Sequence, residues 1–284
     1  MDVYIIIPFH NEEQYIKSTI ESIINQSYTV KKLLLVNDNS NDKSSSLVKK
    51  YVETFDWISE ISTKSIQKHL PGEKVIKAFN FGLNNIDNNY DVICKFDADI
   101  ILPNDYIEKI VGFYEKDSSL GMASGILFIK KKSKWIYENI ASKKHVRGPI
   151  KSYRKQCFKD IGGLKESIGW DTIDVLLSKY NKWNIKTDTN LIVKHQKETG
   201  ANYDKSAKFL QGEALYKMRF GITLSVLSAL KRAYNKKSLT YFIYLIVGYF
   251  KASINKIDAV VNEKEGEFIR NLTWKSVRSK LLKR

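Results

Sequence analysis

Two aspartates separated by one residue are the strongest candidates for chemistry in this 284-residue sequence. Asp97 and Asp99 directly follow the apolar run Val92–Phe96, which predicts a buried strand. Two carboxylates at the end of a strand can share one hard divalent cation, and such a cation can bridge a diphosphate. The same pattern also occurs in acidic turns that cap a helix. Its position after an apolar strand favours the metal-binding interpretation.

Three other polar residues follow predicted strands or begin predicted helices. Asp38 ends a second apolar run, where a carboxylate can accept hydrogen bonds from a ribose or a base, although Asn- and Asp-rich segments also form turns without a ligand. Asp171 can cap a helix, hold its carboxylate over a cleft, or do both. His195 is one of four histidines and is a possible third metal ligand, but a lone histidine is more often structural.

The first hundred residues alternate between strands and helices, which predicts right-handed crossovers and a parallel sheet. Ligands of such sheets bind beyond the carboxyl ends of the strands. We therefore expect the polar segments 8–11, 37–41 and 97–99 to meet along one edge. The predicted strands are 3–7, 32–36, 58–62 and 92–96. Three helices are predicted: the first follows Asn11, which is its expected N-cap, and the other two span 46–55 and 74–84.

The second part of the chain is less regular. It contains a predicted helix at 106–114, a strand at 122–129, a helix from about 171 and a strand at 190–194, and segment 135–147 has no clear periodicity. We expect a catalytic domain at residues 1–204, with a nucleotide-binding half at about 1–100 and an acceptor-binding half at 101–204. Residues 205–284 form a basic helical tail.

The net charge of +16 is concentrated in that tail, which holds 17 basic and 5 acidic residues. Its apolar runs 220–230 and 238–250 fall short of the roughly 20 residues that cross a bilayer. Because basic residues bound both runs, we expect helices that lie on an anionic membrane, or helices that pack on the catalytic domain. Nucleic acid is a poorer partner, since no basic groove studded with aromatic residues is evident.

The remaining composition favours a cytoplasmic protein on the inner face of the cell membrane. Cys94 and Cys157 fit no metal-binding spacing and are expected to be reduced thiols. An apolar strand begins at Val3 with no basic leader before it, so we do not expect secretion.

Five segments together resemble the family 2 glycosyltransferases over roughly residues 1–200. Asn37, Asn39 and Trp170 depart from the family pattern. The resemblance extends to Gly200 and the basic segment that follows it. The matching segments are Ile5–Glu13 with the Pro-x-x-Asn-Glu turn, Val36–Ser40 with Val-Asp-Asp-Gly-Ser, Lys77–Gly82 with Ala-x-Asn-x-Gly, Phe96–Asp99 with Asp-x-Asp, and Gly169–Asp171 with Glu-Asp.

The resemblance implies an α/β GT-A fold, Rossmann-like, with a mostly parallel central sheet flanked by helices and a basic, membrane-associating helical extension. It implies inverting transfer from a nucleotide-diphosphate sugar to a hydroxyl of a glycan or lipid-linked acceptor, in the synthesis of surface polysaccharide or glycolipid. Mn²⁺ or Mg²⁺ is the expected cofactor. The implied roles are catalytic base for Asp171, metal ligands for Asp97, Asp99 and His195, nucleotide-sugar binding for Pro8, Phe9, Asn11, Glu12, Asp38, Lys77, Asp97 and Ala98, and acceptor binding for Trp170 and Arg147.

Two other functions are compatible with part of this pattern. A nucleotidyltransferase also places carboxylates at strand ends, but its first loop is typically basic and rich in glycine, whereas loop 8–13 has two Glu, no Gly and no Lys. A non-catalytic scaffold that only binds nucleotide-sugars would not need Asp38, Asp97, Asp99 and Asp171, all of which are present.

Overall fold

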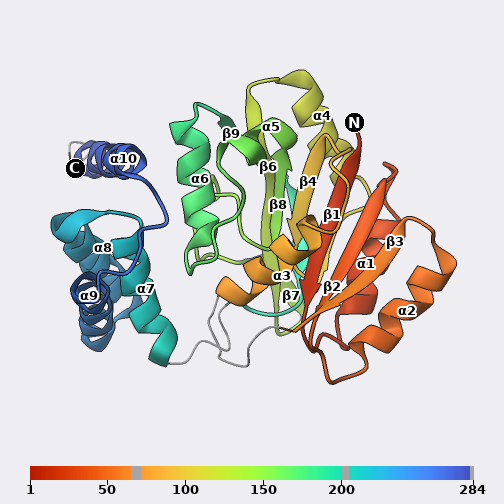
Figure 1. The fold of residues 1–284 in the computed structure, drawn as a ribbon, viewed down its shortest axis with the longest axis horizontal. Coiled ribbons are helices and arrows are strands. Elements are labelled where there is room, and N and C mark those ends of the chain that lie inside the picture. The colour runs from red at the N-terminus through yellow and green to blue at the C-terminus, as the bar shows by residue number, and fades with distance from the viewer. Residues whose placement is uncertain (65–71, 200–204, 282–284) are drawn as a thin grey trace. The chain divides into compact units, whose positions relative to one another are not determined.

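The computed structural model describes residues 1–64, 72–199 and 205–281, which form two compact units (Figure 1). The first unit comprises Met1–His69, Lys74–Leu164 and Asn181–Ala201, and the second Leu70–Glu73, Lys165–Tyr180 and Asn202–Arg284. Segment 165–180 therefore groups with the tail. The predicted functional division at residue 204 remains a prediction, and Gly200 lies outside the described residues.

The described part of the first unit is built on a nine-stranded sheet in the order β3-β2-β1-β4-β8-β6-β9-β5, with β7 paired to β6. The first four strands in this order are parallel, as predicted. The rest of the sheet is mixed, because β8 runs antiparallel to both β4 and β6. The strands are β1 (Val3–Phe9), β2 (Lys32–Asp38), β3 (Ile58–Thr63), β4 (Val92–Phe96), β5 (Ile100–Ile101), β6 (Leu120–Lys131), β7 (Lys134–Tyr137), β8 (Ile150–Arg154) and β9 (Asn184–His195).

Helices cover both faces of this sheet, and the alternation of side chains along the strands determines which helix packs where. Ile5 and Ile7 face a core that includes residues of α1 (Ile16–Ile24), α2 (Ser44–Thr54) and α4 (Tyr106–Lys116). Ile6 faces α3 (Glu73–Leu83) on the opposite side, where a Cβ added at Gly82 would lie 3.0 Å from the Ile6 Cγ2 atom. The short helix α5 (Lys155–Asp160) joins α3 through the ring contact of Phe158 with Phe79.

The prediction that Asn11 caps the first helix is wrong. Helix α1 begins at Ile16 after Tyr15 and has no side-chain cap. Asn11 instead has a left-handed backbone with φ of 55°, a conformation that asparagine tolerates better than most residues. Its backbone N–H donates to Ser40 Oγ and its side-chain oxygen accepts from the Asn41 N–H, so Asn11 joins the loops that follow β1 and β2.

The second unit is helical, as predicted for the tail. Its helices are α6 (Trp170–Tyr180), α7 (Lys205–Lys217), α8 (Gly221–Lys236), α9 (Leu239–Ile254) and α10 (Glu263–Leu281). Helices α7 and α9 cross closely at two glycines: a Cβ at Gly212 would lie 1.9 Å from the Leu245 carbonyl oxygen, and one at Gly248 2.0 Å from that of Phe209. Across residues 1–64, 72–199 and 205–281, no helix is long and apolar enough to cross a membrane.

Candidate active site

The Asp97-Ala98-Asp99 segment follows β4, and the first unit holds its backbone at three points. The Asp97 N–H donates to the Pro149 carbonyl at 3.0 Å, and the buried Thr19 hydroxyl donates to the Ala98 carbonyl at 2.7 Å. The Gln196 N–H donates to the Asp99 carbonyl at 2.8 Å. The carboxylates are therefore mounted on a fixed backbone, as a preorganised site requires.

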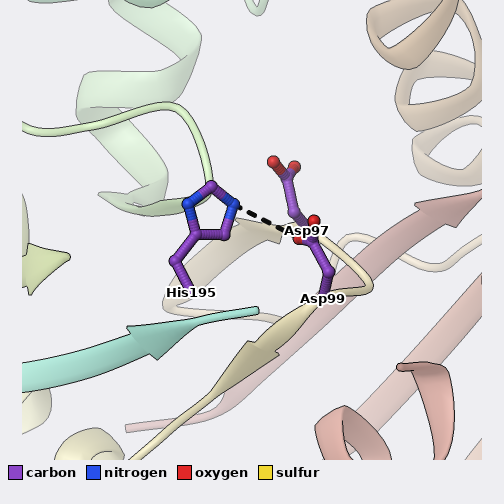
Figure 2. A group of neighbouring side chains, drawn as sticks. All are labelled: Asp97, Asp99 and His195. Atoms are coloured by element: carbon purple, nitrogen blue, oxygen red, sulfur yellow. Dashed lines mark ion pairs between the residues drawn. The ribbon is translucent and has the colours of Figure 1, made fainter. Parts of the chain in front are cut away.

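Strand pairing brings His195 to the same place from nearly a hundred residues away. Ile100 of β5 lies opposite His195 at the end of β9. As a result, His195 Nε2 lies 3.5 Å from Asp99 Oδ1 (Figure 2). One ligand atom each from Asp97, Asp99 and His195 lie within 4.8 Å of one another. The metal-ligand set proposed from the sequence is thus one compact cluster.

This cluster fits a hard divalent cation. Asp99 is 7% exposed, and its Oδ1 atom forms an ion pair with His195 Nε2 at 3.5 Å but no hydrogen bond of good geometry among the residues that the structure describes. A buried carboxylate oxygen with only one long polar contact is costly, and a bound cation can satisfy it. Carboxylate oxygens and a neutral imidazole nitrogen are donors that suit Mn²⁺, and the oxygens also suit Mg²⁺.

Two lysines already supply positive charge to these carboxylates. The Lys95 side chain is buried and its ammonium group contacts Asp97. Lys197 contacts Glu12, and its Nζ atom lies 3.8 Å from Asp99 Oδ2. Burial opposes the charge of Lys197, but the hydrogen bond that it donates to Glu12, together with the negative charges of Glu12 and Asp99, outweighs burial and raises the Lys197 pKa. A divalent cation would therefore share Asp97 with Lys95 and lie near the charge of Lys197.

Glu138 is a buried residue of the site that the sequence did not reveal. Its Oε2 atom lies 3.2 Å from His195 Nδ1 and 2.9 Å from Arg147 Nη2, and its Oε1 atom accepts from the Thr199 N–H at 2.8 Å. Burial disfavours the charge on Glu138. This effect is outweighed by the hydrogen bonds from His195 and Thr199 and by the charge of Arg147. Together they lower the Glu138 pKa to about 2. A buried carboxylate on the far side of a metal-binding histidine typically fixes the tautomer and orientation of the ring.

His195 itself lies between two carboxylates. Burial favours the neutral ring, but the nearby carboxylates of Asp99 and Glu138 favour the imidazolium and raise the His195 pKa to about 9. The two carboxylates therefore favour the protonated form of His195 in the absence of a cation.

The predicted nucleotide-binding residues lie at the ends of β1 and β2. Pro8 and Phe9 end β1, and the buried Asp38 ends β2, where its carbonyl oxygen lies 2.7 Å from His10 Nδ1. The Glu12 N–H donates to Ser44 Oγ at 2.7 Å, while its buried Oε2 atom has no partner in the described structure. Glu12 is connected to Asp99 of the metal-ligand set through Lys197, and nucleotide binding by these residues remains a prediction.

The other predicted site residues differ in their surroundings. Lys77 is exposed on α3. Arg147 is buried with its guanidinium on Glu138, so its contacts position the site, and acceptor binding remains a prediction for it. Trp170 and Asp171 lie in the first turn of α6, in the second unit. There burial lowers the pKa of the half-buried Arg232 of α8, and the charges of Tyr241 and Asp171 partly offset that effect.

Comparison with known proteins assigns the family. Residues 4–165 match the sequence profile described as Glycosyl transferase family 2, which covers more than half of the chain. The chain therefore belongs to family 2 of the glycosyltransferases. Its sheet of mixed strands with flanking helices is the GT-A fold expected from the sequence.

Three similar proteins illustrate the match. A probable glycosyltransferase of Bacillus subtilis, YdaM, is 36% identical over 99 residues, which are 34% of this chain and 22% of YdaM. The minor teichoic acid biosynthesis protein GgaB of the same organism is 30% identical over 117 residues, 40% of this chain and 12% of GgaB. The chain thus spans only a small part of these relatives.

The third is a solved structure. The mannosyltransferase PcManGT from Pyrobaculum calidifontis, in complex with GDP-Man and Mn²⁺, superimposes with a TM-score of 0.58 at 12% identity. The superposition covers 97% of this chain and 80% of that one. At this level of identity the likeness establishes the fold alone.

Proposed function

We propose that this protein transfers a sugar from a nucleotide-diphosphate sugar to a hydroxyl of a glycan or lipid-linked acceptor, with inversion at the anomeric carbon. The observation that carries the proposal is the convergence of Asp97, Asp99 and His195 at the strand ends of a family 2 chain. The fold shared with a mannosyltransferase solved with GDP-Man and Mn²⁺ supports it, as does the similarity to a protein of teichoic acid biosynthesis.

The donor would lie along the carboxyl ends of β1, β2 and β4. Asp38 would accept hydrogen bonds from the nucleoside, with Pro8, Phe9, Asn11, Glu12, Lys77 and Ala98 around it. Asp97, Asp99 and His195 would hold Mn²⁺ or Mg²⁺. When bound, such a cation supplies positive charge that stabilises the diphosphate leaving group.

Asp171 is proposed as the base. An acceptor hydroxyl is a weak nucleophile, and a carboxylate that removes its proton during attack contributes about 10²–10⁴-fold to the rate. The proton would pass from the hydroxyl to a carboxylate oxygen of Asp171. Trp170 adjoins this residue in α6 and is proposed, with Arg147, to contact the acceptor.

The test is a panel of UDP-, GDP- and dTDP-sugars with and without Mn²⁺, in which release of nucleoside diphosphate and the anomeric configuration of the product are measured. We expect turnover that EDTA abolishes and that Asp99→Ala reduces to background. Asp56→Ala, which changes an exposed carboxylate of the same unit, is the matched control. Full activity in EDTA would overturn the metal assignment, and binding without turnover in the whole panel would leave only a scaffold. Pyrophosphate release from a nucleoside triphosphate would indicate a nucleotidyltransferase.

We also propose that helices α8 and α9 dock on an anionic membrane, at the cytoplasmic face. Segment 221–254 contains five basic residues and no acidic one. Apolar side chains on both helices are exposed, among them Tyr234 at 84%, Leu239 at 75% and Ile254 at 76%. Exposed apolar groups flanked by lysines suit an interface with acidic lipids, each basic residue contributing about 1 kcal/mol near the surface.

Vesicle flotation tests this second part. The chain should float with phosphatidylglycerol vesicles at low salt and not with phosphatidylcholine vesicles. Leu239→Ser combined with Ile254→Ser should weaken flotation severalfold. Ile140→Ser, which removes an exposed isoleucine from the other unit, should not. If the chain does not float with phosphatidylglycerol vesicles at low salt, the membrane proposal is wrong and the tail serves only for packing.

A further inference from the structure

A cavity of about 410 Å³ lies wholly within the second unit. It is bounded by the end of α7, the start of α8, the loop after α9 and the middle of α10. Its volume is within the range of about 300–1,000 Å³ that small-molecule sites occupy. None of its lining residues belongs to the proposed donor site. The residues that give it chemical character are Tyr216, Arg219, Tyr249, Asp258, Ala259 and Arg270.

The two arginines differ in how they are held. Arg219 donates from Nε to the Val261 carbonyl at 2.9 Å and pairs with Glu263 at 2.5 Å. Arg270 donates from Nη1 to the Arg219 carbonyl at 2.9 Å and has no carboxylate within ion-pair distance among the described residues. Its side chain also lies beside the start of α8, since a Cβ at Gly221 would be 3.7 Å from Arg270 Cδ. Arg270 thus brings a positioned but uncompensated guanidinium to the cavity.

The other walls offer a different chemistry. Asp258 is an exposed carboxylate that can accept hydrogen bonds from hydroxyl groups. The rings of Tyr216 and Tyr249 meet edge to face with centroids 5.7 Å apart, and they supply an apolar surface with polar tips. The Tyr249 hydroxyl, whose pKa burial raises further above neutrality, can donate a hydrogen bond.

These groups together select one class of ligand. A guanidinium is the side chain best suited to a phosphate, because it can make two parallel charge-assisted hydrogen bonds. Asp258 would repel a bare inorganic anion but would bind the hydroxyls of a molecule attached to one. A neutral sugar would leave Arg270 without a counter-charge. The combination therefore fits a phosphate group joined to a polyol or a sugar.

We infer that this cavity is a binding site for a phosphorylated polyol or sugar, with Arg270 on the phosphate and Asp258 on the hydroxyls. The phosphate can come from a soluble phosphate-containing glycan or from the headgroup of a lipid, because both present the same groups. The inference uses only residues of the second unit and does not rest on the proposed transfer reaction.

Calorimetric titration of the intact chain with sn-glycerol 3-phosphate, without donor or metal, tests the site. We expect saturable binding, with glycerol and inorganic phosphate binding much more weakly. Arg270→Gln should weaken binding about tenfold or more, as expected for the loss of a charge-assisted hydrogen bond. Arg278→Gln is the matched control, because Arg278 is exposed on the same helix and does not line the cavity. Asp99→Ala should bind like the unaltered chain.

A second variant shows whether a loss of binding in Arg270→Gln could result from misfolding. Ala259→Leu fills the cavity without changing its charge and should also block binding, while circular dichroism reports on the fold of each variant. Flotation with phosphatidylglycerol vesicles separates the two sources: if glycerol 3-phosphate competes with the vesicles and Arg270→Gln weakens flotation, the ligand is a headgroup. If Arg270→Gln floats normally but loses glycerol 3-phosphate, the ligand is a soluble glycan. No binding of glycerol 3-phosphate, or equal losses in Arg270→Gln and Arg278→Gln, would overturn the site.

Discussion

Binding of Mn²⁺ to the cluster of Asp97, Asp99 and His195 should tighten as pH rises. A metal requires the neutral imidazole, whereas the metal-free site favours the imidazolium. Burial of His195 works against its charge, but Asp99 and Glu138 on either side of the ring raise its pKa to about 9. The cation and a proton therefore compete for one histidine.

The size of the effect follows from this pKa. At pH 7 the ring is about two units below it, so only about 1% of the metal-free protein has a neutral His195. The apparent dissociation constant for Mn²⁺ should therefore be about a hundredfold weaker than its limiting value, and should fall about tenfold per pH unit up to about pH 9. In the metal-free fold the raised pKa contributes stability below the ordinary histidine pKa of about 6.5, and that contribution is lost as pH rises toward 9.

Calorimetry in two buffers of different ionisation enthalpy measures both the affinity and the proton released at each pH. We expect close to one proton released per Mn²⁺ near pH 7. Glu138→Gln removes one of the two carboxylates, so it should lower the His195 pKa and flatten the pH dependence. Glu115→Gln, on the exposed face of α4, should leave it unchanged. An affinity that does not vary between about pH 6.5 and 8.5 would refute the reasoning.

Three further substitutions test separate parts of the structure. Asp171→Asn should keep donor affinity in a binding titration but lower the single-turnover rate by about 10²–10⁴-fold, and a normal rate would place the base elsewhere. Gly125→Ala should destabilise the sheet by about 1–3 kcal/mol in thermal denaturation, because its Cβ would lie 2.1 Å from the Leu191 carbonyl oxygen; Gly112→Ala in α4 meets no atom within 4 Å and should not destabilise. Asn11→Ala should weaken donor binding severalfold in the same titration, because it strains a left-handed residue and removes the hydrogen bond that joins two loops, and an unchanged affinity would show that this link is dispensable.

The sequence predicted the parallel half of the sheet well, for a simple physical reason. Strands buried on both faces are largely apolar, so Val3–Phe9 stands out as a continuous apolar run, and Val92–Phe96 stands out as a run interrupted only by the buried Lys95. The antiparallel half is harder to recognise, because its strands carry buried polar residues. Strand β8 reads Ile-Lys-Ser-Tyr-Arg, and the adjacent Lys151 and Ser152, although buried, leave no apolar run that predicts a strand.

The candidate site was predicted unevenly. Asp97 and Asp99 follow a recognisable strand, and local sequence is sufficient to identify them. His195 is adjacent to them only because β5 pairs with the end of β9, and that pairing has no local signature. Glu138 lies in a segment without periodicity. Its role depends on two contacts: one with His195, which is distant in sequence, and one with Arg147, which is near in sequence but buried. Such a residue becomes apparent only from the folded structure.

The proposed base depends on the tail for its surroundings, which decides how the tail must be tested. Helix α6 packs on α10, where the Tyr180 and Phe268 rings meet with centroids 5.5 Å apart, and the charge of Asp171 acts on Arg232 of α8. Deleting the tail would expose α6 and change the electrostatic environment of Asp171, so a loss of transfer in a truncated chain would not by itself demonstrate membrane docking. Leu239→Ser with Ile254→Ser alters exposed side chains of α9 and leaves those contacts in place. If docking matters, this double variant should lose transfer to lipid-linked acceptors and keep transfer to soluble ones, whereas the truncated chain should lose both.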